Sequence, residues 1–313
     1  MDKIEFIKNA ISAAGFQLGG VSATSAGYVN PDIWNMKLLD FQRENLVVAK
    51  LGKVYNDLLN VPGEVLNVSV DAEPTSASEL TETNDVTIDA LSFTQVVFTP
   101  TEYGAAYQVS DKEARRAFFD VMSNITAKIG YRMAVKKEKI AINVLQVGAG
   151  NRVIANNVVA SDIASTDTID EDDIANAATL IRADNYMPRQ LVISAMQLGD
   201  LMKISTFKQA YAYGGREVIL GGKLGVVYGL EVIWSNLIAK ALGGAGATSA
   251  RALVLGTSGT GEESFGVCQK SNPKISTQYF ALGRYTDFVG VEEYDVKVLH
   301  ANAICTIQSY VTA

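Results

Sequence analysis

The most motif-like stretch of this sequence is the glycine-rich run Gly256-Thr-Ser-Gly-Thr-Gly-Glu262, which has the composition of a loop that cradles phosphate groups. In a phosphate-binding loop the glycines lead into Lys-Ser or Lys-Thr, because the lysine reaches the phosphates and the hydroxyl holds magnesium. No such pair follows here. The glycines at 214, 215, 221, 222 and 225 also miss the spacing of a dinucleotide-binding turn. We interpret both runs as turns and expect no cofactor-binding site.

A nucleophile with its base is equally hard to assemble from this sequence. Ser194 and Ser258 lack the G-x-S-x-G context, and the single histidine, His300, stands in a C-terminal β segment. Cys268 and Cys305 are the only cysteines, which with one histidine are too few for a four-ligand zinc site or a disulfide framework. We therefore expect no catalytic residues and no enzyme.

The acidic run at residues 170–173 is the remaining candidate for chemistry, as a cation site. It stands where a helix is predicted to begin, and carboxylates there favour the positive end of the helix dipole. The run is explained without a metal, so we expect no metal site.

Composition limits the class of protein. The chain has 313 residues, enough for one large domain or two to three lobes, and 48% of them are hydrophobic. A net charge of −7 disfavours strong nonspecific nucleic-acid binding. No apolar run of membrane-spanning length is present, and the opening Met-Asp-Lys-Ile-Glu does not resemble a signal peptide. We expect a protein made in the cytoplasm with no membrane partner.

Charge is divided unevenly between two neighbouring segments. Residues 54–111 contain no lysine or arginine and carry −10, from Asp57, Glu64, Asp71, Glu73, Glu79, Glu82, Asp85, Asp89, Glu102 and Asp111. Residues 112–152 carry nine bases and three acids, hence +6. The simplest interpretation is two solvated charged surfaces. The alternative is that the acidic segment of one copy lies over the basic segment of another, since complementary fields set partner and register.

One long helix is predicted over residues 110–148, at the start of the basic segment. The range lacks proline, and Ser110 with Glu113 forms a capping box that satisfies free N–H groups at a helix start. Apolar residues recur at helical spacing, at Phe118, Met122, Ile125, Ile129, Met133, Ile140, Val144 and Val147. At 1.5 Å per residue such a helix would be roughly 55 Å long.

The acidic segment instead alternates like β-structure. Residues 54–110 predict two long strands around an exposed tip at Ala72–Asn84. Beyond the long helix, Thr168 and Glu171 suggest a second capping box, and a helix is expected at Ala195–Lys203. The tail after residue 262 is predicted to be mainly β. The fold class is therefore α+β.

This order of parts resembles the major capsid proteins of tailed phages and related viruses, the Hong Kong 97 phage-like fold. The resemblance includes the run Pro188-Arg-Gln-Leu-Val-Ile-Ser-Ala, the helix ending at Lys203, the glycine loop Gly221–Gly229, the strand ending at Asn236, and Arg284-Tyr-Thr-Asp287. It implies an N-terminal arm at 1–53, an extended β-hairpin (E-loop) at 54–110, a peripheral domain with the spine helix at 111–173 and 262–313, and an axial domain at 174–261.

The resemblance implies a major capsid protein that self-assembles, as hexamers and pentamers, into an icosahedral shell enclosing double-stranded DNA. It would reside in the virion and be assembled in the host cytoplasm. Some members cross-link through a hairpin lysine; this hairpin has none, so we expect noncovalent cohesion. The arm is too short for a cleaved scaffolding region. Separate scaffolding and portal proteins are therefore expected, and a decoration protein is an option. An encapsulin-type nanocompartment shell is the alternative, and an enzyme with an unrecognised site is the weakest.

Overall fold

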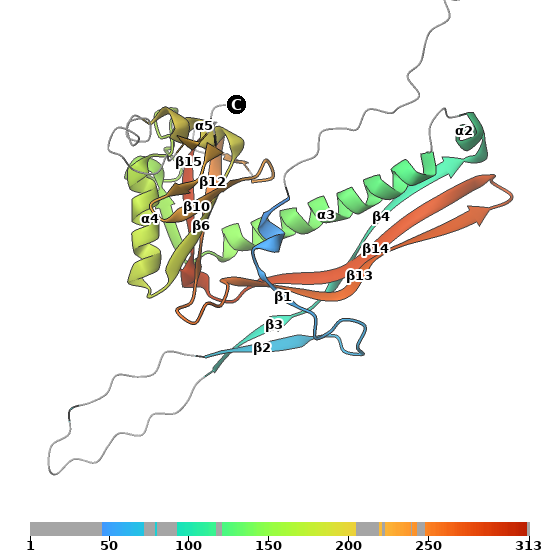
Figure 1. The fold of residues 1–313 in the computed structure, drawn as a ribbon, viewed down its shortest axis with the longest axis horizontal. Coiled ribbons are helices and arrows are strands. Elements are labelled where there is room, and N and C mark those ends of the chain that lie inside the picture. The colour runs from blue at the N-terminus through green and yellow to red at the C-terminus, as the bar shows by residue number, and fades with distance from the viewer. Residues whose placement is uncertain are drawn as a thin grey trace, which may run out of the picture. The chain divides into compact units, whose positions relative to one another are not determined.

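The computed structural model describes residues 46–71, 79, 93–116, 121–204, 219–220, 223–238, 240–242 and 248–311 (Figure 1). The described residues mix helices and strands, so the α+β class is confirmed. Most of the predicted N-terminal arm and the predicted hairpin tip lie outside the described residues.

The described helices are α2 (Asp111–Arg116), α3 (Val121–Gly148), α4 (Glu171–Ala183) and α5 (Ala195–Lys203), with short 3-10 turns η1 (Val48–Lys50), η2 (Ala155–Asn157) and η5 (Ala301–Ala303). The strands are β1 (Lys53–Tyr55), β2 (Leu66–Asp71), β3 (Phe93–Phe98), β4 (Thr101–Ser110), β5 (Asn151–Ile154), β6 (Met187–Ile193), β7 (Ile219–Leu220), β8 (Lys223–Leu224), β9 (Val226–Val227), β10 (Leu230–Trp234), β11 (Lys240–Leu242), β12 (Thr248–Thr257), β13 (Phe265–Phe280), β14 (Tyr285–Val298) and β15 (Ile304–Tyr310).

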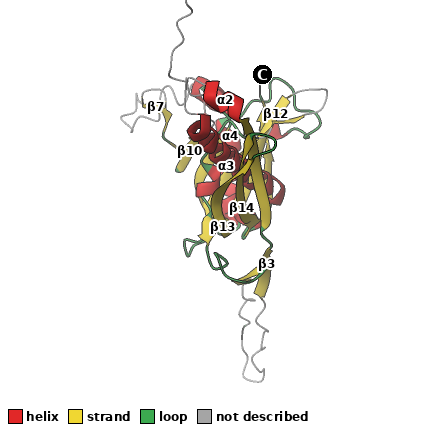
Figure 2. Cartoon of the chain, turned by 90° about the vertical axis from the view of Figure 1, so that its right-hand side faces the viewer, coloured by secondary structure: helices red, strands yellow, loops and turns green. Residues whose placement is uncertain are grey.

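A four-stranded sheet carries α3. Its strands follow the order β1-β13-β14-β4, and β14 and β4 pair antiparallel from Tyr285 with Ser110 to Tyr294 with Thr101. Figure 1 and Figure 2 both show α3 lying against these strands. In the described part of the chain β4 pairs with β14 alone, so its other edge carries unpaired backbone groups, a template for another strand.

A second, seven-stranded sheet follows the order β5-β15-β12-β6-β10-β9, with β11 paired to β12. Successive side chains in a strand point to opposite faces, and here both faces are buried. Leu191 and Val254 pack on one face with Ile174 and Ile181 of α4. Val192 and Leu253 pack on the other face in the same core as α3. This two-sided burial explains why the strands are apolar at consecutive positions.

The predicted single apolar stripe on the long helix is only half correct. Ile125, Ile129 and Met133 are buried over Phe288 of the four-stranded sheet, as expected. Further along, Leu145 is fully buried while Val147 is 75% exposed. At 3.6 residues per turn the two buried sets, 125–133 and 141–145, lie on roughly opposite sides of the helix. The buried side changes because the second half packs against η1 and the seven-stranded sheet.

The expected helix over 110–148 is described in two pieces, α2 and α3, and residues 117–120 between them lie outside the description. The capping box at its start is confirmed, since the Glu113 backbone N–H donates to Ser110 Oγ at 3.3 Å and the Ser110 N–H donates to Glu113 Oε2 at 3.3 Å.

The second predicted capping box is wrong by two residues. Helix α4 begins at Glu171 with Asp170 as its N-cap, and the Asp170 backbone N–H donates to Asp173 Oδ2 at 3.1 Å. The acidic run therefore supplies both halves of the box itself, and Thr168 stays outside the helix. Helix α5 has the predicted bounds.

The predicted two-stranded hairpin is shorter than its sequence range. Strands β2 and β3 pair antiparallel from Leu66 with Phe98 to Asp71 with Phe93. After β3 the chain continues into β4, which pairs with β14 in the four-stranded sheet and does not extend the hairpin. The Thr99 backbone N–H, just after β3, donates to Asp295 Oδ2 of β14 at 2.9 Å, which attaches the base of the hairpin to the four-stranded sheet.

Candidate functional site

The basic segment forms two cationic surfaces along one side of the four-stranded sheet. The first, which we call the groove, lies between β4 and α3 and holds a cavity of about 430 Å³. Its lining includes the small residues Gly104, Ala105 and Ala106 of β4 and the exposed bases Arg132, Lys136 and Lys139 of α3, which we call its rim. These three bases are spaced by four and three residues, so they share one helical face.

Two of the rim cations lie over tyrosine rings of β4, the edge strand of the four-stranded sheet. The Arg132 guanidinium lies 4.8 Å from the Tyr107 ring centroid, and Lys136 Nζ lies 5.8 Å from that of Tyr103. A cation over an aromatic face is attracted to the ring and keeps its charge exposed. Both cations are solvent-exposed, and neither forms an ion pair within the described residues. The groove therefore presents positive charge beside unpaired strand edge.

Lys137 lies between Lys136 and Lys139 in sequence, but it forms an ion pair within the fold. Its Nζ lies 2.7 Å from Glu292 Oε1, and the two side chains are 18% and 5% exposed. The same ammonium stands 4.9 Å from the ring centroid of buried Tyr294. Burial, followed by the nearby Glu292 charge, raises the pKa of the Tyr294 hydroxyl. Lys137 therefore compensates a buried carboxylate and is not available to a partner.

Glu138 is the second charged residue of α3 whose side chain is bound within the fold. It is 1% exposed, and its carboxylate accepts from the backbone N–H groups of Val47, Val48 and Ala49 at 2.8, 2.6 and 2.8 Å. Charge-assisted bonds to backbone N–H groups are short and strong. The carboxylate thus fixes the turn η1 against α3, at the place where the described chain begins.

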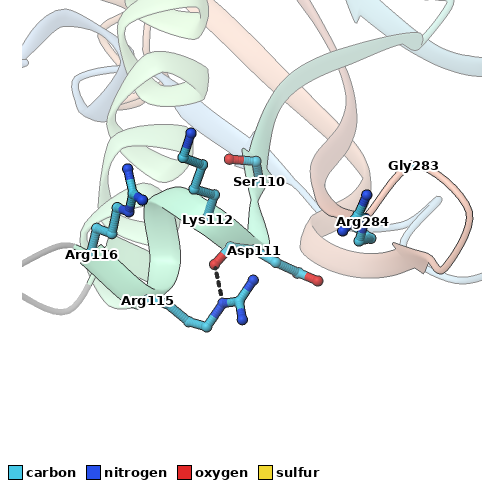
Figure 3. A pocket seen from close by; sticks show the side chains of 7 residues that line it. All are labelled: Ser110, Asp111, Lys112, Arg115, Arg116, Gly283 and Arg284. Carbon is cyan, nitrogen blue, oxygen red and sulfur yellow. Dashed lines mark hydrogen bonds between the residues drawn. The ribbon is translucent and has the colours of Figure 1, made fainter.

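The second cationic surface, which we call the α2 pocket, lies where α2 meets the turn between β13 and β14 (Figure 3). It has a volume of about 630 Å³. Its lining comprises Ser110, Asp111, Lys112, Arg115 and Arg116 from α2 and its start, with Gly283 and Arg284 from the turn.

Hydrogen bonds hold the α2 pocket in shape. The Asp111 backbone N–H donates to the Arg284 carbonyl at 3.0 Å, and Arg115 Nε donates to the Asp111 carbonyl at 3.1 Å. The Tyr279 hydroxyl donates to Asp111 Oδ2 at 2.9 Å, and this bond raises the pKa of Tyr279. The one carboxylate of the pocket is therefore engaged, while its four cations form no ion pair within the described ranges.

The residues considered for catalysis are not brought together. Ser194 caps α5, with its Oγ accepting from the Gln197 N–H at 3.2 Å. His300 Nδ1 lies 3.4 Å from the Tyr186 hydroxyl. Ser258 stands in an exposed turn after β12, so the glycine-rich run is part of a strand and a turn. Each of these residues has a local structural use.

The two thiols are free and buried in the fold. Burial raises the pKa of Cys268 to about 11 and that of Cys305 to about 12. Among the described residues no group of three or more His, Cys, Asp or Glu side chains is arranged to hold a metal ion. No described helix has both the length and the apolar content to cross a membrane.

Sequence reasoning missed Arg284, Tyr103 and Tyr107 at these surfaces. Arg284 lies far from the basic segment in sequence, and its residue type alone gave no signal. The tyrosines carried a weak signal, since they alternate on one face of β4 and are four apart, like the bases at 132 and 136. Only the pairing of β4 with β14 places them under α3.

Comparison with known proteins gives a consistent result. A family model described as phage capsid protein matches residues 93–307. No curated protein matches the chain.

Similar solved structures include one of Mycobacterium phage Che8, at 16% identity and a TM-score of 0.71, covering 90% of this chain and 98% of that one. The Cyanophage Pam1 capsid asymmetric unit matches at 11% identity and a TM-score of 0.72, covering 93% and 99%. The capsid of Ralstonia phage GP4 matches at 14% identity and a TM-score of 0.67, covering 93% and 99%. The fold is the Hong Kong 97-like capsid fold expected from the sequence.

Proposed function

The chain belongs to the phage capsid protein family and is a capsid shell protein, and from this premise we propose how its copies join. The acidic hairpin of one copy lies over the groove of the next, and repetition of this contact closes an icosahedral shell around double-stranded DNA. The contact joins two different surfaces of the subunit, and such heterologous contacts generate rings and lattices.

The observation that carries this proposal is the exposed rim of the groove. The side chains of Arg132, Lys136 and Lys139 place positive charge beside β4. The outer edge of β4 has no partner strand among the described residues. Residues 54–111 of the same sequence carry −10 with no base. A two-stranded hairpin is marginally stable alone, so docking on another copy stabilises it.

Cohesion in this shell is noncovalent. Residues 54–110 contain no lysine, so the hairpin cannot supply the amine of an isopeptide cross-link. Strand addition at the β4 edge, ion pairs and buried apolar area remain to hold the copies together. The expected test is a denaturing gel of boiled particles, which should show one monomer band. A ladder of multimers would contradict noncovalent cohesion.

The parts of the chain take the following roles in the proposal: an N-terminal arm (1–53), an E-loop (54–110), a peripheral domain with the spine helix (111–173 and 262–313), and an axial domain (174–261). Two findings support this division. The strands β13 and β14 form the sheet that carries α3, and β6, β10 and β12 form a separate sheet.

We further propose that the copies form hexamers and pentamers. A separate scaffolding protein, a portal protein and an optional decoration protein complete the particle. DNA is enclosed without sequence-specific binding, and assembly takes place in the host cytoplasm. The role is structural and not catalytic, since the candidate nucleophiles and the histidine each serve a local contact.

Electron microscopy of the purified chain, alone and with its scaffold, tests the shell. Closed particles, hexamers or pentamers are the expected result. A soluble monomer under every assembly condition would contradict it. The encapsulin alternative is not favoured by the family match, and packaged DNA in the particle, as opposed to a cargo enzyme, separates the two.

A further inference from the structure

The α2 pocket gathers positive charge that the proposed contact between copies does not use. Lys112, Arg115 and Arg116 come from α2, and Arg284 comes from the turn between β13 and β14. Figure 3 shows Arg284 on the opposite side of Asp111 from Arg116. Four cations and one carboxylate therefore border a cavity of about 630 Å³, which is large enough for a small anionic ligand.

The acidic side chains of α2 are already bound within the fold. Asp111 Oδ2 accepts from the Tyr279 hydroxyl at 2.9 Å, and the Glu113 carboxylate is held in the helix cap. The hydrogen bond to the carboxylate raises the pKa of Tyr279, whereas the charges of Arg284 and Arg115 lower it. Guanidiniums from two elements therefore act on one hydroxyl, and no carboxylate among the described residues forms an ion pair with either of them.

Arg284 has a backbone conformation that arginine rarely adopts. Its φ is +53°, in the left-handed region, where Cβ crowds the following carbonyl oxygen. Six described residues other than glycine have a positive φ, and four of them are asparagines: Asn60, Asn156, Asn157, Asn185, Tyr228 and Arg284. Asparagine tolerates this conformation because its short side chain can bond to the nearby backbone. An arginine at such a position therefore needs a reason other than the turn itself.

The turn that carries Arg284 is fixed on both sides. The Arg284 N–H donates to the Phe280 carbonyl at 2.8 Å, and the Arg284 carbonyl accepts from the Asp111 N–H at 3.0 Å. The rings of Phe280 and Tyr285 lie with their centroids 5.0 Å apart. A Cβ on Gly283 would overlap the Tyr285 ring, so this position requires glycine. The strained arginine is thus held in place without a ligand, which lowers the entropic cost of binding one.

We propose that the α2 pocket binds a phosphate-bearing polyanion, in which two or more phosphate groups follow one another. Strained residues that the surrounding structure holds in place cluster at functional sites. Three of the four cations are arginines, whose planar forks bind phosphate oxygens in pairs. A tetrahedral phosphate offers oxygens in several directions, which suits cations that approach from α2 and from the turn. A free polyphosphate and the backbone of a nucleic acid share this chemistry.

The binding test uses the full-length subunit before assembly, so its result does not depend on the contact between copies. Calorimetric titration with tripolyphosphate at low salt should show saturable binding at one site per chain. Its affinity should fall as salt is added, because the site is exposed and its charges are screened. Absence of saturable binding, or equally tight binding of the tricarboxylate citrate, would overturn the phosphate assignment.

Arg284→Asn is the main variant, because asparagine suits the left-handed backbone while the charge is removed. Affinity for tripolyphosphate should fall about tenfold, since a charge-assisted bidentate contact is lost. The urea midpoint should stay equal or rise, because strain is relieved. Arg284→Lys keeps the charge without the planar fork, and its affinity should fall about threefold. Unchanged affinity in Arg284→Asn, or a lower urea midpoint that assigns the arginine to the fold, would overturn the proposal.

The matched control is Arg189→Gln, which removes one arginine that is 59% exposed and does not line the pocket. Its affinity should change by less than about twofold, because separated surface charges are screened. A loss equal to that of Arg284→Asn would show that net charge alone binds the anion, and would overturn the site.

A second titration separates the two sources of phosphate. Short duplex DNA replaces tripolyphosphate, with the original chain and with Arg284→Asn. DNA binding that weakens in the variant supports a nucleic-acid backbone in the pocket, and binding of tripolyphosphate alone supports a free polyphosphate. DNA binding that the variant leaves unchanged, without tripolyphosphate binding, would be nonspecific and would overturn the proposal. The proposed function fails separately, if charge reversal in the groove leaves assembly intact.

Discussion

Lys136 and Lys137 are neighbours on α3 with opposite uses. Lys137 is held 2.7 Å from Glu292 in the interior, and the next residue, Glu138, binds three backbone N–H groups. Lys136 lies over a tyrosine ring at the groove, with its charge exposed. Adjacent residues point about 100° apart on a helix, so Lys137 faces the interior while Lys136 faces the exposed groove.

This difference shows that the net charge of a segment has two components, charge that is paired inside the fold and charge that stays exposed. Part of the +6 of the basic segment offsets buried charge within the fold, and only the remainder is left exposed for the contact between copies that we propose. Replacing a buried partner leaves an uncompensated charge and costs folding free energy. Replacing a rim charge costs little folding free energy and changes association.

The largest expected effect is that of Lys137→Glu. It places a second carboxylate beside Glu292 and should lower the free energy of unfolding by about 5 kcal/mol. Urea denaturation of the unassembled subunit measures it. The control is Lys136→Glu, one residue away, which should cost less than about 1 kcal/mol. Equal losses from the two variants would remove the distinction between internal and rim charge.

Glu138→Ala should rank second. It leaves three backbone N–H groups without their acceptor, which should cost about 4 kcal/mol. Glu138→Gln retains one carbonyl acceptor and should lose about half as much. Limited proteolysis reports the local effect, because cleavage near Val47 should accelerate in both variants. A Glu138→Ala subunit as stable as the original would show that η1 is held by packing alone.

Leu145→Ala comes next and tests the change of buried side along α3. Leu145 is fully buried, so its truncation should cost about 3 kcal/mol. Val147, which is 75% exposed, lies on the stripe expected from the sequence, and Val147→Ala should cost less than about 0.5 kcal/mol. Thermal unfolding of the two variants decides between the two stripes. A larger loss from Val147→Ala than from Leu145→Ala would support the single apolar stripe predicted from the sequence.

Reversal of the whole rim should have a small effect on folding and a large one on assembly. Arg132→Glu, Lys136→Glu and Lys139→Glu together lose two cation–ring contacts, about 1 kcal/mol. Particles should be absent by electron microscopy while the subunit stays folded. A variant with Lys at 132 and Arg at 136 and 139 keeps the charges and should assemble. Normal particles from the reversed triple would show that the hairpin does not use the groove.

Salt should give the smallest effect on the subunit itself. Raising ionic strength from about 0.05 to 0.5 M screens exposed charges much more than buried ones. Assembly should slow markedly, followed by light scattering, while the unfolding midpoint of the unassembled subunit should move by less than about 2 °C. Assembly that does not depend on salt would indicate that apolar contacts, and not the rim, bring copies together.

Much of the local structure could be predicted from sequence. The capping box at Ser110 and the bounds of α5 depend on residues a few positions apart, and both are confirmed. The cap of α4 was misplaced because four consecutive acids offer several nearly equivalent starts. The tail after residue 262 is mainly β, as predicted, in β13, β14 and β15.

By itself, the sequence determined the element types, the absence of a recognisable catalytic motif, and the division of charge into an acidic and a basic segment. Those properties depend on composition and on residues near one another in the chain. The tertiary structure decided which charges stay available, because Lys137 meets Glu292 across 155 positions and Glu138 meets residues about 90 positions away. It also brought Arg284 to α2, since only the β13–β14 turn carries that side chain to the pocket. Contacts at such separations follow from sheet register and helix packing, which no local pattern encodes.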